Sequence, residues 1–315
     1  YISIYCTMRL FLFFIFLITP FTLSAEVLRV VILGSGTPRL DIDRFSQSIL
    51  VEAGDERLLF DTGRGTAIRL SQMNVNLSSV NNIFFTHLHS DHIVGFPDVL
   101  MTGWVYQREK TLNIFGPSGT KNFVDNIKNA FNEDIKIRLE KPEELKMPGL
   151  KTYVKEISDG LVYRSKNVEV HAINVDHGGG VEHAYGYKIN YKDKSVVISG
   201  DTNYSEELVN AANDVDILIH EIAAAPSSLI NKSEKVRGIM NYHTTPEELT
   251  KIINQTKAKL TVLNHVLLLG GITEDKVLKL IKTNLDKDTE VMFGYDLLAI
   301  ELTDRINTYS VDYTK

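Results

Sequence analysis

The chain has 315 residues, of which 43% are hydrophobic and 23% are charged, and its formal net charge is -6. This length allows one large core or two modest ones, and the composition is ordinary for a globular protein. The acidic balance gives no reason to expect attraction to nucleic acid or to an anionic membrane through overall charge.

The first 25 residues differ from the rest of the chain. A short positive start at Met8-Arg9 is followed by an apolar run over 10–18 and then by small residues up to Ala25. This pattern is typical of a signal peptide, and the run is shorter than the ~20 residues of a membrane span. We expect a signal peptide over 1–25 with Met8 as the true start, although a retained N-terminal anchor is the alternative. The mature protein would then be exported, periplasmic or secreted, with no stable membrane span after cleavage.

Strand and helix patterns alternate from residue 26 to residue 315. A β-branched run over 27–33 ends in a Gly- and Pro-containing turn, and Gly54-Asp55 lies between two strand patterns, as in a hairpin. Further strands are predicted over 83–85, 112–115, 168–175, 184–189, 195–199, 215–219 and 259–263, and helices over 66–73, 93–106 and 121–130. A single domain of mixed α/β layers over 26–315 explains this order. The charged stretch 136–163 has no clear pattern and could form a lid or a dimer contact.

Four residues with metal-binding side chains follow the predicted strand 83–85. They are His87, His89, Asp91 and His92. The only cysteine, Cys6, precedes Met8, so imidazole and carboxylate are the expected ligands. Alternation places His87 and His89 on one side of an extended segment, while Asp91 and His92 turn toward a second position where the next helix begins. Two metals sharing one cleft explain this cluster better than a polar loop with chance histidines.

The run His87-x-His89-x-Asp91-His92 resembles the signature of the metallo-β-lactamase superfamily. Three further segments resemble other motifs of that superfamily: Phe60-Asp61-Thr62-Gly63, Ser199-Gly200-Asp201-Thr202 and Leu263-Asn264-His265. In the first of these motifs the Asp orients a ligand imidazole. The resemblance covers almost the whole mature chain. It implies an α/β (α+β) fold, a four-layer αββα sandwich with the metals at one edge.

The third histidine of the first metal has two candidates. His177 directly follows the predicted strand 168–175, as the motif requires, whereas the glycines at 178–180 make the spacing to Gly186 long. We expect His177, with His183 as the alternative that could face the substrate. The resemblance implies that metal one is bound by His87, His89 and His177, metal two by Asp91, His92 and His265, and that Asp201 bridges them. Two divalent ions are expected, zinc by default, with manganese or iron fitting the same set.

Two later segments narrow the branch of the superfamily. Ile219-His220-Glu221 follows a predicted strand, and Tyr242-His243 precedes a helix start with Thr245 as N-cap and Glu248 completing a capping box. A helix start alone does not require His243. Together the segments resemble the tRNase Z and arylsulfatase-like branch, in which a Glu orients a histidine that protonates the leaving group. Glu221 and His243 are the candidates for these roles.

The expected reaction is hydrolysis by a hydroxide that two metals activate, with Asp91 as a ligand that also accepts the proton of the water. His243 would act as the general acid. A tRNase Z normally has a long arm between its third motif and the bridging Asp, but here a short hairpin occupies the space between His177 and Asp201. A small-molecule ester is therefore the expected partner, either a phosphodiester or an aryl sulfate. Nucleic acid is not expected, and a homodimer is left open.

Other readings of the same ligand set are less favoured. A lactonase shares all seven ligands but leaves Glu221 and His243 unexplained. True β-lactam hydrolysis is disfavoured because those enzymes typically lack the bridging Asp, and a diiron oxygen-reducing protein has a Glu where His89 stands. A non-catalytic metal-binding protein is the alternative from another functional class.

Overall fold

The computed structural model describes residues 27–286 and 289–313, and its strands form two sheets. The predicted signal peptide over 1–25 lies outside the described residues and stays a prediction. In spatial order, the first sheet contains β15 (Ile306–Ser310), β14 (Leu298–Leu302), β1 (Leu28–Gly34), β2 (Ser48–Ala53), β3 (Glu56–Phe60), β4 (Asn82–Phe84), β5 (Leu112–Gly116) and β6 (Thr152–Glu156). The second contains β13 (Glu290–Phe293), β12 (Leu260–Leu268), β11 (Ile217–Ala224), β10 (Lys194–Ile198), β9 (Ala184–Tyr191), β8 (Val168–Val175) and β7 (Gly160–Arg164).

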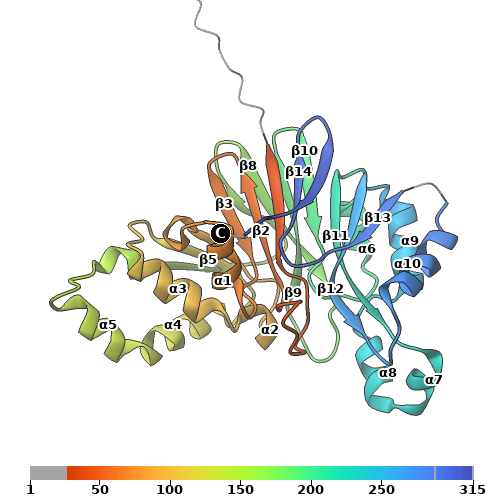
Figure 1. The fold of residues 1–315 in the computed structure, drawn as a ribbon, viewed down its shortest axis with the longest axis horizontal. Helices are drawn as coiled ribbons and strands as arrows, with labels where there is room; N and C mark the ends of the chain where they lie inside the picture. The colour runs from red at the N-terminus through yellow and green to blue at the C-terminus, as the bar shows by residue number, and fades with distance from the viewer. Residues whose placement is uncertain (1–26, 287–288, 314–315) are drawn as a thin grey trace, which may run out of the picture.

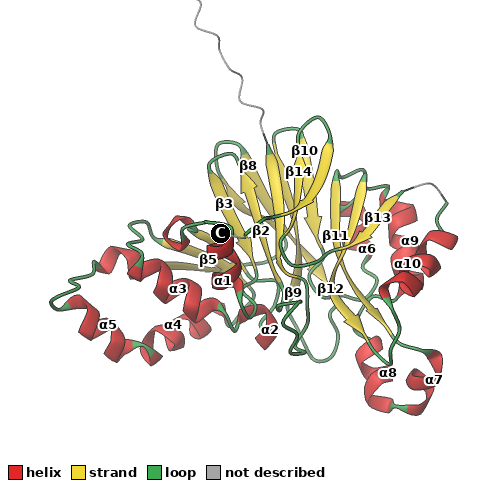
Figure 2. Ribbon diagram, viewed as in Figure 1, coloured by secondary structure: helices red, strands yellow, loops and turns green. Residues whose placement is uncertain are grey.

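Helices cover the outer faces of both sheets (Figure 1). The first sheet is flanked by α1 (Thr66–Gln72), α2 (Ser90–Ile93), α3 (Phe96–Val105), α4 (Thr120–Ala130) and α5 (Asn132–Leu139). The second is flanked by α6 (Glu206–Ala211), α9 (Pro246–Thr256) and α10 (Glu274–Thr283), while α7 (Ser227–Lys232) and α8 (Glu234–Met240) form a pair at its lower end. Single 3-10 turns occur at Leu77–Ser79 and Met147–Leu150. The layers are therefore helix, sheet, sheet and helix, as predicted (Figure 2).

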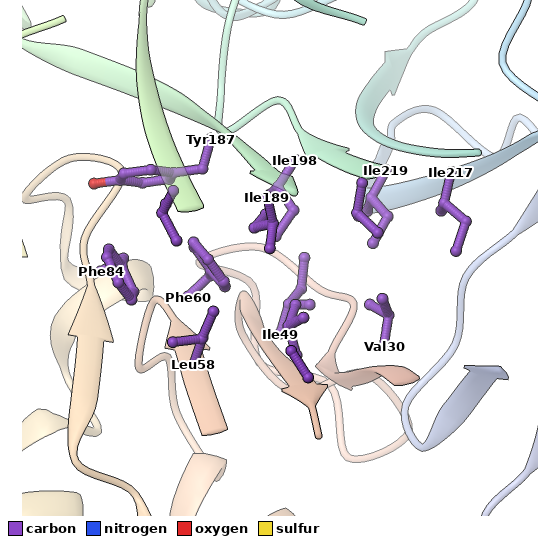
Figure 3. Packing of buried hydrophobic residues seen from close by; sticks show 14 of the residues in the cluster. Val30, Ile49, Leu58, Phe60, Phe84, Tyr187, Ile189, Ile198, Ile217 and Ile219 are labelled. Carbon is purple, nitrogen blue, oxygen red and sulfur yellow. The ribbon is translucent and has the colours of Figure 1, made fainter. Parts of the chain in front are cut away.

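Alternation along the strands explains the layered core. On β2, Ile49 and Val51 belong to the core between the sheets, whereas Leu50 packs in the cluster on the helix side. Successive side chains of a strand point to opposite faces, so one strand serves both layers. Figure 3 shows residues of the two sheets facing one another, including Phe84 of β4 and Tyr187 of β9, whose ring centroids are 5.7 Å apart.

The core also holds the loop that carries the histidine cluster. The Tyr187 hydroxyl donates a hydrogen bond of 2.6 Å to the carbonyl of Phe85, two residues before His87. The Tyr185 amide donates to the carbonyl of Thr86 at 2.9 Å. These bonds from the second sheet fix the backbone that follows β4, so packing between the sheets positions the site.

Several predicted elements differ from the observed ones. The predicted helix 93–106 is observed as α3 over Phe96–Val105, and Val94-Gly95 separates it from the short α2, which ends at Ile93. The stretch 136–163 contains the end of α5, β6 and part of β7, and its role as a lid or dimer contact stays a prediction. Within 27–286 and 289–313, no helix combines the length and the apolar character needed to cross a membrane.

Candidate metal centre

All seven predicted metal ligands meet at one edge of the sandwich. The loop after β4 supplies His87 and His89, and α2 supplies Asp91 and His92. Segments of the second sheet supply the other three, which are His177 after β8, Asp201 after β10 and His265 on β12. Because β10, β11 and β12 run parallel, their carboxyl-terminal parts lie at the same edge of the sheet.

Asp61, which follows β3, anchors the histidine loop. One of its carboxylate oxygens accepts the Thr86 amide at 2.8 Å, and the other accepts the Thr86 hydroxyl at 2.9 Å. The second oxygen also lies 2.7 Å from Nδ1 of His92. All three residues are fully buried. A carboxylate in this position fixes the orientation of the His92 ring and directs its Nε2 toward the cluster, as predicted for Asp61.

A first group of ligand atoms combines three histidines. Potential ligand atoms of His87, His89 and His177 lie within 4.8 Å of one another. His87 Nε2 is 3.0 Å from His89 Nδ1. Asp201 lies beside this group, since its Oδ2 is 4.0 Å from His87 Nε2 and 3.9 Å from His177 Nε2.

A second group combines Asp91, His92 and His265, whose ligand atoms also lie within 4.8 Å of one another. His265 Nε2 is 3.1 Å from Asp91 Oδ2 and 3.3 Å from Asp201 Oδ2. His92 Nε2 is 3.4 Å from the same Asp201 oxygen. Asp201 thus lies between the two groups.

The chemistry of these atoms fits divalent metal ions. His92 Nε2, His177 Nε2 and Asp201 Oδ1 are buried and have no hydrogen-bond partner among the described residues. Buried polar atoms without partners are costly, so a cluster of them around carboxylates has the chemistry of a cation-binding site. Burial opposes the ionisation of Asp201, but His265 and His92 lower its pKa well below the usual range. The resulting anion suits a position between two cations.

His265 was predicted to follow its strand, but in the structure it lies within β12. β12 continues to Leu268, and the pairing with β11 passes from Asn264 to Val266, which leaves His265 in a bulge. Its backbone has a φ of 43°. A bulge redirects one side chain out of the alternating pattern. Here it directs the imidazole toward Asp91.

Glu221 and His243 form a pair beside the second group. Glu221 lies within β11, not after the strand as predicted, and its Oε1 is 3.2 Å from His243 Nδ1. The same oxygen accepts the Thr244 amide at 2.8 Å. Burial disfavours a cationic His243, but the Glu221 carboxylate outweighs it and the pKa rises to about 9. His243 also shares a group of potential ligand atoms with Asp201 and His265.

The start of α9 holds His243 in this position. The Thr245 side chain accepts the Glu248 amide at 3.3 Å, and the Glu248 carboxylate accepts the Thr245 amide at 2.9 Å. The predicted capping box is thus confirmed, with Pro246 at the first position of the helix. The cap fixes the direction from which the chain enters α9 and therefore the place of His243.

His183 lies apart from both groups. It is exposed and precedes β9, and no metal-binding group among the described residues includes it. His177, by contrast, is buried and lies 4.6 Å from His87 between ring centroids. The structure thus places His177, the preferred candidate, beside His87 and His89. The alternative, His183, lines a neighbouring cavity.

Two residues of the site were not predicted. Thr86 contacts Asp61, His87 and His92, and Tyr242 stacks on His177 with ring centroids 5.6 Å apart. Tyr242 helps to line a cavity of about 210 Å³ over the cluster, together with Pro38 of the turn after β1. The only signal in the sequence was adjacency, since Thr86 directly precedes His87 and Tyr242 directly precedes His243, and neither residue type is a usual metal ligand.

Comparisons with known proteins identify relatives of this chain. The model of the family described as "Anti-Pycsar protein Apyc1" matches residues 28–266. A ribonuclease Z of Mycolicibacterium gilvum (strain PYR-GCK) is 31% identical over 280 residues, which cover 88% of this chain and 96% of that protein.

Solved structures show the same fold. The metallo-β-lactamase fold protein YhfI of Bacillus subtilis has a TM-score of 0.67 at 18% identity, covering 88% of this chain and 100% of that one. The short form of human tRNase Z has a TM-score of 0.64 at 21% identity, covering 86% and 98%. The predicted αββα sandwich is therefore confirmed. The chain belongs to the family described as anti-Pycsar protein Apyc1, within the ribonuclease Z-like part of the metallo-β-lactamase superfamily, and is a metal-dependent hydrolase that acts on ester bonds.

Proposed function

We propose that the protein is a two-metal phosphodiesterase whose substrate is a small phosphodiester. The observation that carries the proposal is the contact of 3.2 Å between His243 and Glu221 beside Asp201 and His265. A metal cluster alone suits many hydrolases, but a histidine oriented by a carboxylate next to it suits a reaction in which a poor leaving group must be protonated.

The proposed ligands follow the two groups of atoms. His87, His89 and His177 would hold one ion, Asp91, His92 and His265 the other, and Asp201 would contact both. Zinc is the proposed metal because imidazole and carboxylate in this number suit it, while manganese or iron would use the same side chains. When bound, two such ions supply an activated water at neutral pH and neutralise charge on phosphoryl oxygens.

The chain's own residues then move the protons. Asp91 has one carboxylate oxygen 3.1 Å from His265, inside the cluster, and would accept a proton from the attacking water. His243 would donate a proton to the leaving oxygen from the other side. Glu221 keeps the His243 ring in place through Nδ1, so that Nε2 is left to face the substrate.

Two observations favour a small ester over a nucleic acid. Only β9, β10 and their turn, together with the loop before β9, separate His177 from Asp201, so no long arm is present there. The cavity over the cluster is about 210 Å³, which suits one esterified phosphate with part of its substituents. The Mycolicibacterium relative is named a ribonuclease, so RNA is the rival substrate outside the small esters. Among the small esters, an aryl sulfate or a lactone is the rival substrate.

The test is a screen of the metal-loaded protein against bis(p-nitrophenyl) phosphate, p-nitrophenyl sulfate, an acyl lactone and a precursor tRNA. We expect turnover of the phosphodiester that a chelator abolishes and zinc restores. Preference for the sulfate, the lactone or the tRNA by kcat/KM would contradict the proposal, and metal binding without any turnover would support a non-catalytic protein.

His243→Ala tests the acid role. An alkyl leaving group needs the proton, whereas p-nitrophenolate leaves without it. We therefore expect kcat/KM to fall about 10²- to 10⁴-fold for a dialkyl phosphodiester, which must expel an alkoxide, and much less for bis(p-nitrophenyl) phosphate, which expels p-nitrophenolate. His171→Ala is the matched control because His171 is partly exposed on β8, where Glu169 is its neighbour. Equal losses for both leaving groups would refute the acid role.

A further inference from the structure

A second cavity adjoins the metal cluster on the side of the three histidines. Its volume is about 400 Å³, and its walls include both His87 and His89. His89 also lines the cavity over the cluster, so the two spaces meet at that ring. A group attached to an ester that is bound at the cluster can therefore extend into the second cavity. We call this space the His183 pocket, after the exposed histidine on its wall.

Three consecutive glycines precede the segment that lines one side of the His183 pocket, and the last of them, Gly180, belongs to the lining itself. Gly178, Gly179 and Gly180 have φ values of 66°, 59° and 89°, a region that other residues rarely adopt. A Cβ at Gly178 or Gly179 would lie 3.3 or 3.4 Å from Tyr242, so the loop packs closely on the ring that stacks on His177. The loop continues into Glu182 and His183, which line the pocket together with Pro117 and Ser118 of the turn before α4.

The lining of the pocket combines apolar surface with hydrogen-bonding groups. Leu88, Pro117 and Val181 supply the apolar part, and Ser118, Glu182 and His183 supply polar atoms. Of the described residues on its walls, none is Lys or Arg, while Glu182 brings a negative charge. A second phosphate would be repelled there, whereas an uncharged ring with polar edges finds both contact area and hydrogen bonds.

We propose that the His183 pocket is the subsite for the group that stays on the phosphorus after cleavage, and that this group is an uncharged, hydrogen-bonding ring system. His183 and Glu182 determine the specificity at this subsite. The inference rests on the proposed phosphodiesterase function. It adds that the part of the substrate bound in the His183 pocket carries no charge, so that the negative charge nearest to this pocket is that of the scissile phosphate.

Three substrates with the same leaving group test the subsite. They are the p-nitrophenyl diesters of methyl phosphate, thymidine 5′-phosphate and thymidine 3′,5′-bisphosphate, esterified at the 5′-phosphate. For the wild-type protein we expect the highest kcat/KM with the thymidine 5′-phosphate diester. His183→Ala should lower the ratio of the thymidine to the methyl kcat/KM about five- to tenfold, as expected for one lost hydrogen bond. His171→Ala should leave this ratio unchanged.

Glu182→Lys tests the charge of the subsite in the opposite direction. The added cation should raise the relative kcat/KM of the bisphosphate diester by about threefold. Glu140→Lys, on an exposed residue after α5, is the control. Ratios that do not change in His183→Ala would overturn the subsite while leaving the phosphodiesterase proposal intact. Absence of metal-dependent turnover of all three diesters by the wild-type protein would overturn the proposed function and the subsite with it.

Discussion

Asp61 shows how a residue that contacts no substrate can control the metal cluster. Its carboxylate accepts hydrogen bonds from the amide and the hydroxyl of Thr86 and lies 2.7 Å from His92. Burial raises the pKa of Asp61, whereas its contact with His92 and the Thr86 bonds act in the opposite direction. The network therefore couples the start of the histidine loop to the orientation of one ligand ring.

We expect Asp61→Asn to weaken metal binding about 10- to 100-fold, because the amide cannot accept from both Thr86 and His92 with the geometry of a carboxylate. Competition with a chromogenic chelator would measure the affinity. Asp55→Asn is the control, since Asp55 is exposed in the β2–β3 turn. Unchanged affinity in Asp61→Asn would show that His92 is held by other contacts.

Single residues could be predicted where their type limits their chemistry. His87, His89, Asp91 and His92 form a motif that few other functions require, and the structure brings them together with the more distant Asp201 and His265. Thr86 and Tyr242 could not be predicted in this way. A threonine and a tyrosine have many structural uses, so their place in the site depends on the approach of segments that are distant in sequence.

At the scale of elements, the strands of the second sheet run further than their patterns indicated. β11 and β12 continue through Ala224 and Leu268, although Glu221, Asn264 and His265 interrupt their apolar runs. Pairing with neighbouring strands satisfies the backbone in spite of these polar side chains. A local sequence pattern reflects only the polarity of successive side chains, whereas the length of a strand also depends on pairing with distant segments.

Gly200 in the turn after β10 and Gly160 at the start of β7 both have a positive φ, but they differ in the space around them. Gly200 has a φ of 63°, and a Cβ there would lie 2.6 Å from the Tyr185 carbonyl oxygen; Gly160 has a φ of 100° and open space around it. We expect Gly160→Ala to cost about 1–2 kcal/mol of backbone strain. Gly200→Ala should cost more and weaken metal binding, because Asp201 follows directly.

Urea unfolding of the zinc-loaded and the metal-free forms of both variants would separate these effects. Strain alone lowers the stability of the two forms equally, whereas displacement of Asp201 lowers the stability of the loaded form further. Equal losses for Gly160→Ala and Gly200→Ala would mean that the close approach to Tyr185 carries no cost beyond the left-handed backbone.

For the whole molecule, the motif order predicted the layers but not the order of strands within them. β1 pairs with β14, whose partner residues lie about 270 positions later, and no local pattern reports such a pairing. The two sheets enclose a core in which Phe60 and Phe84 of one face Tyr187 of the other (Figure 3). The metal edge closes this arrangement, since its ligands come from both sheets.

Because the ligands join both sheets, metal ions should stabilise the whole fold. Removal leaves buried carboxylates and imidazoles without a cation, and the stabilisation lost is about 4 kcal/mol for a site at a thousand times its Kd. For a chain of this size we expect Tm to fall by about 10 °C when a chelator is added. Differential scanning calorimetry would show this fall, and zinc should reverse it.

Asp201→Asn serves as the control for this experiment, because the residue between the two groups of ligands then lacks its charge. Its Tm should start lower in the presence of zinc and respond much less to the chelator. The reason is that a neutral amide at position 201 would not supply the negative charge that bound cations need between the two groups of ligands. An equally large chelator effect in Asp201→Asn would place the stabilising metal at another site and separate the fold's stability from the cluster between the sheets.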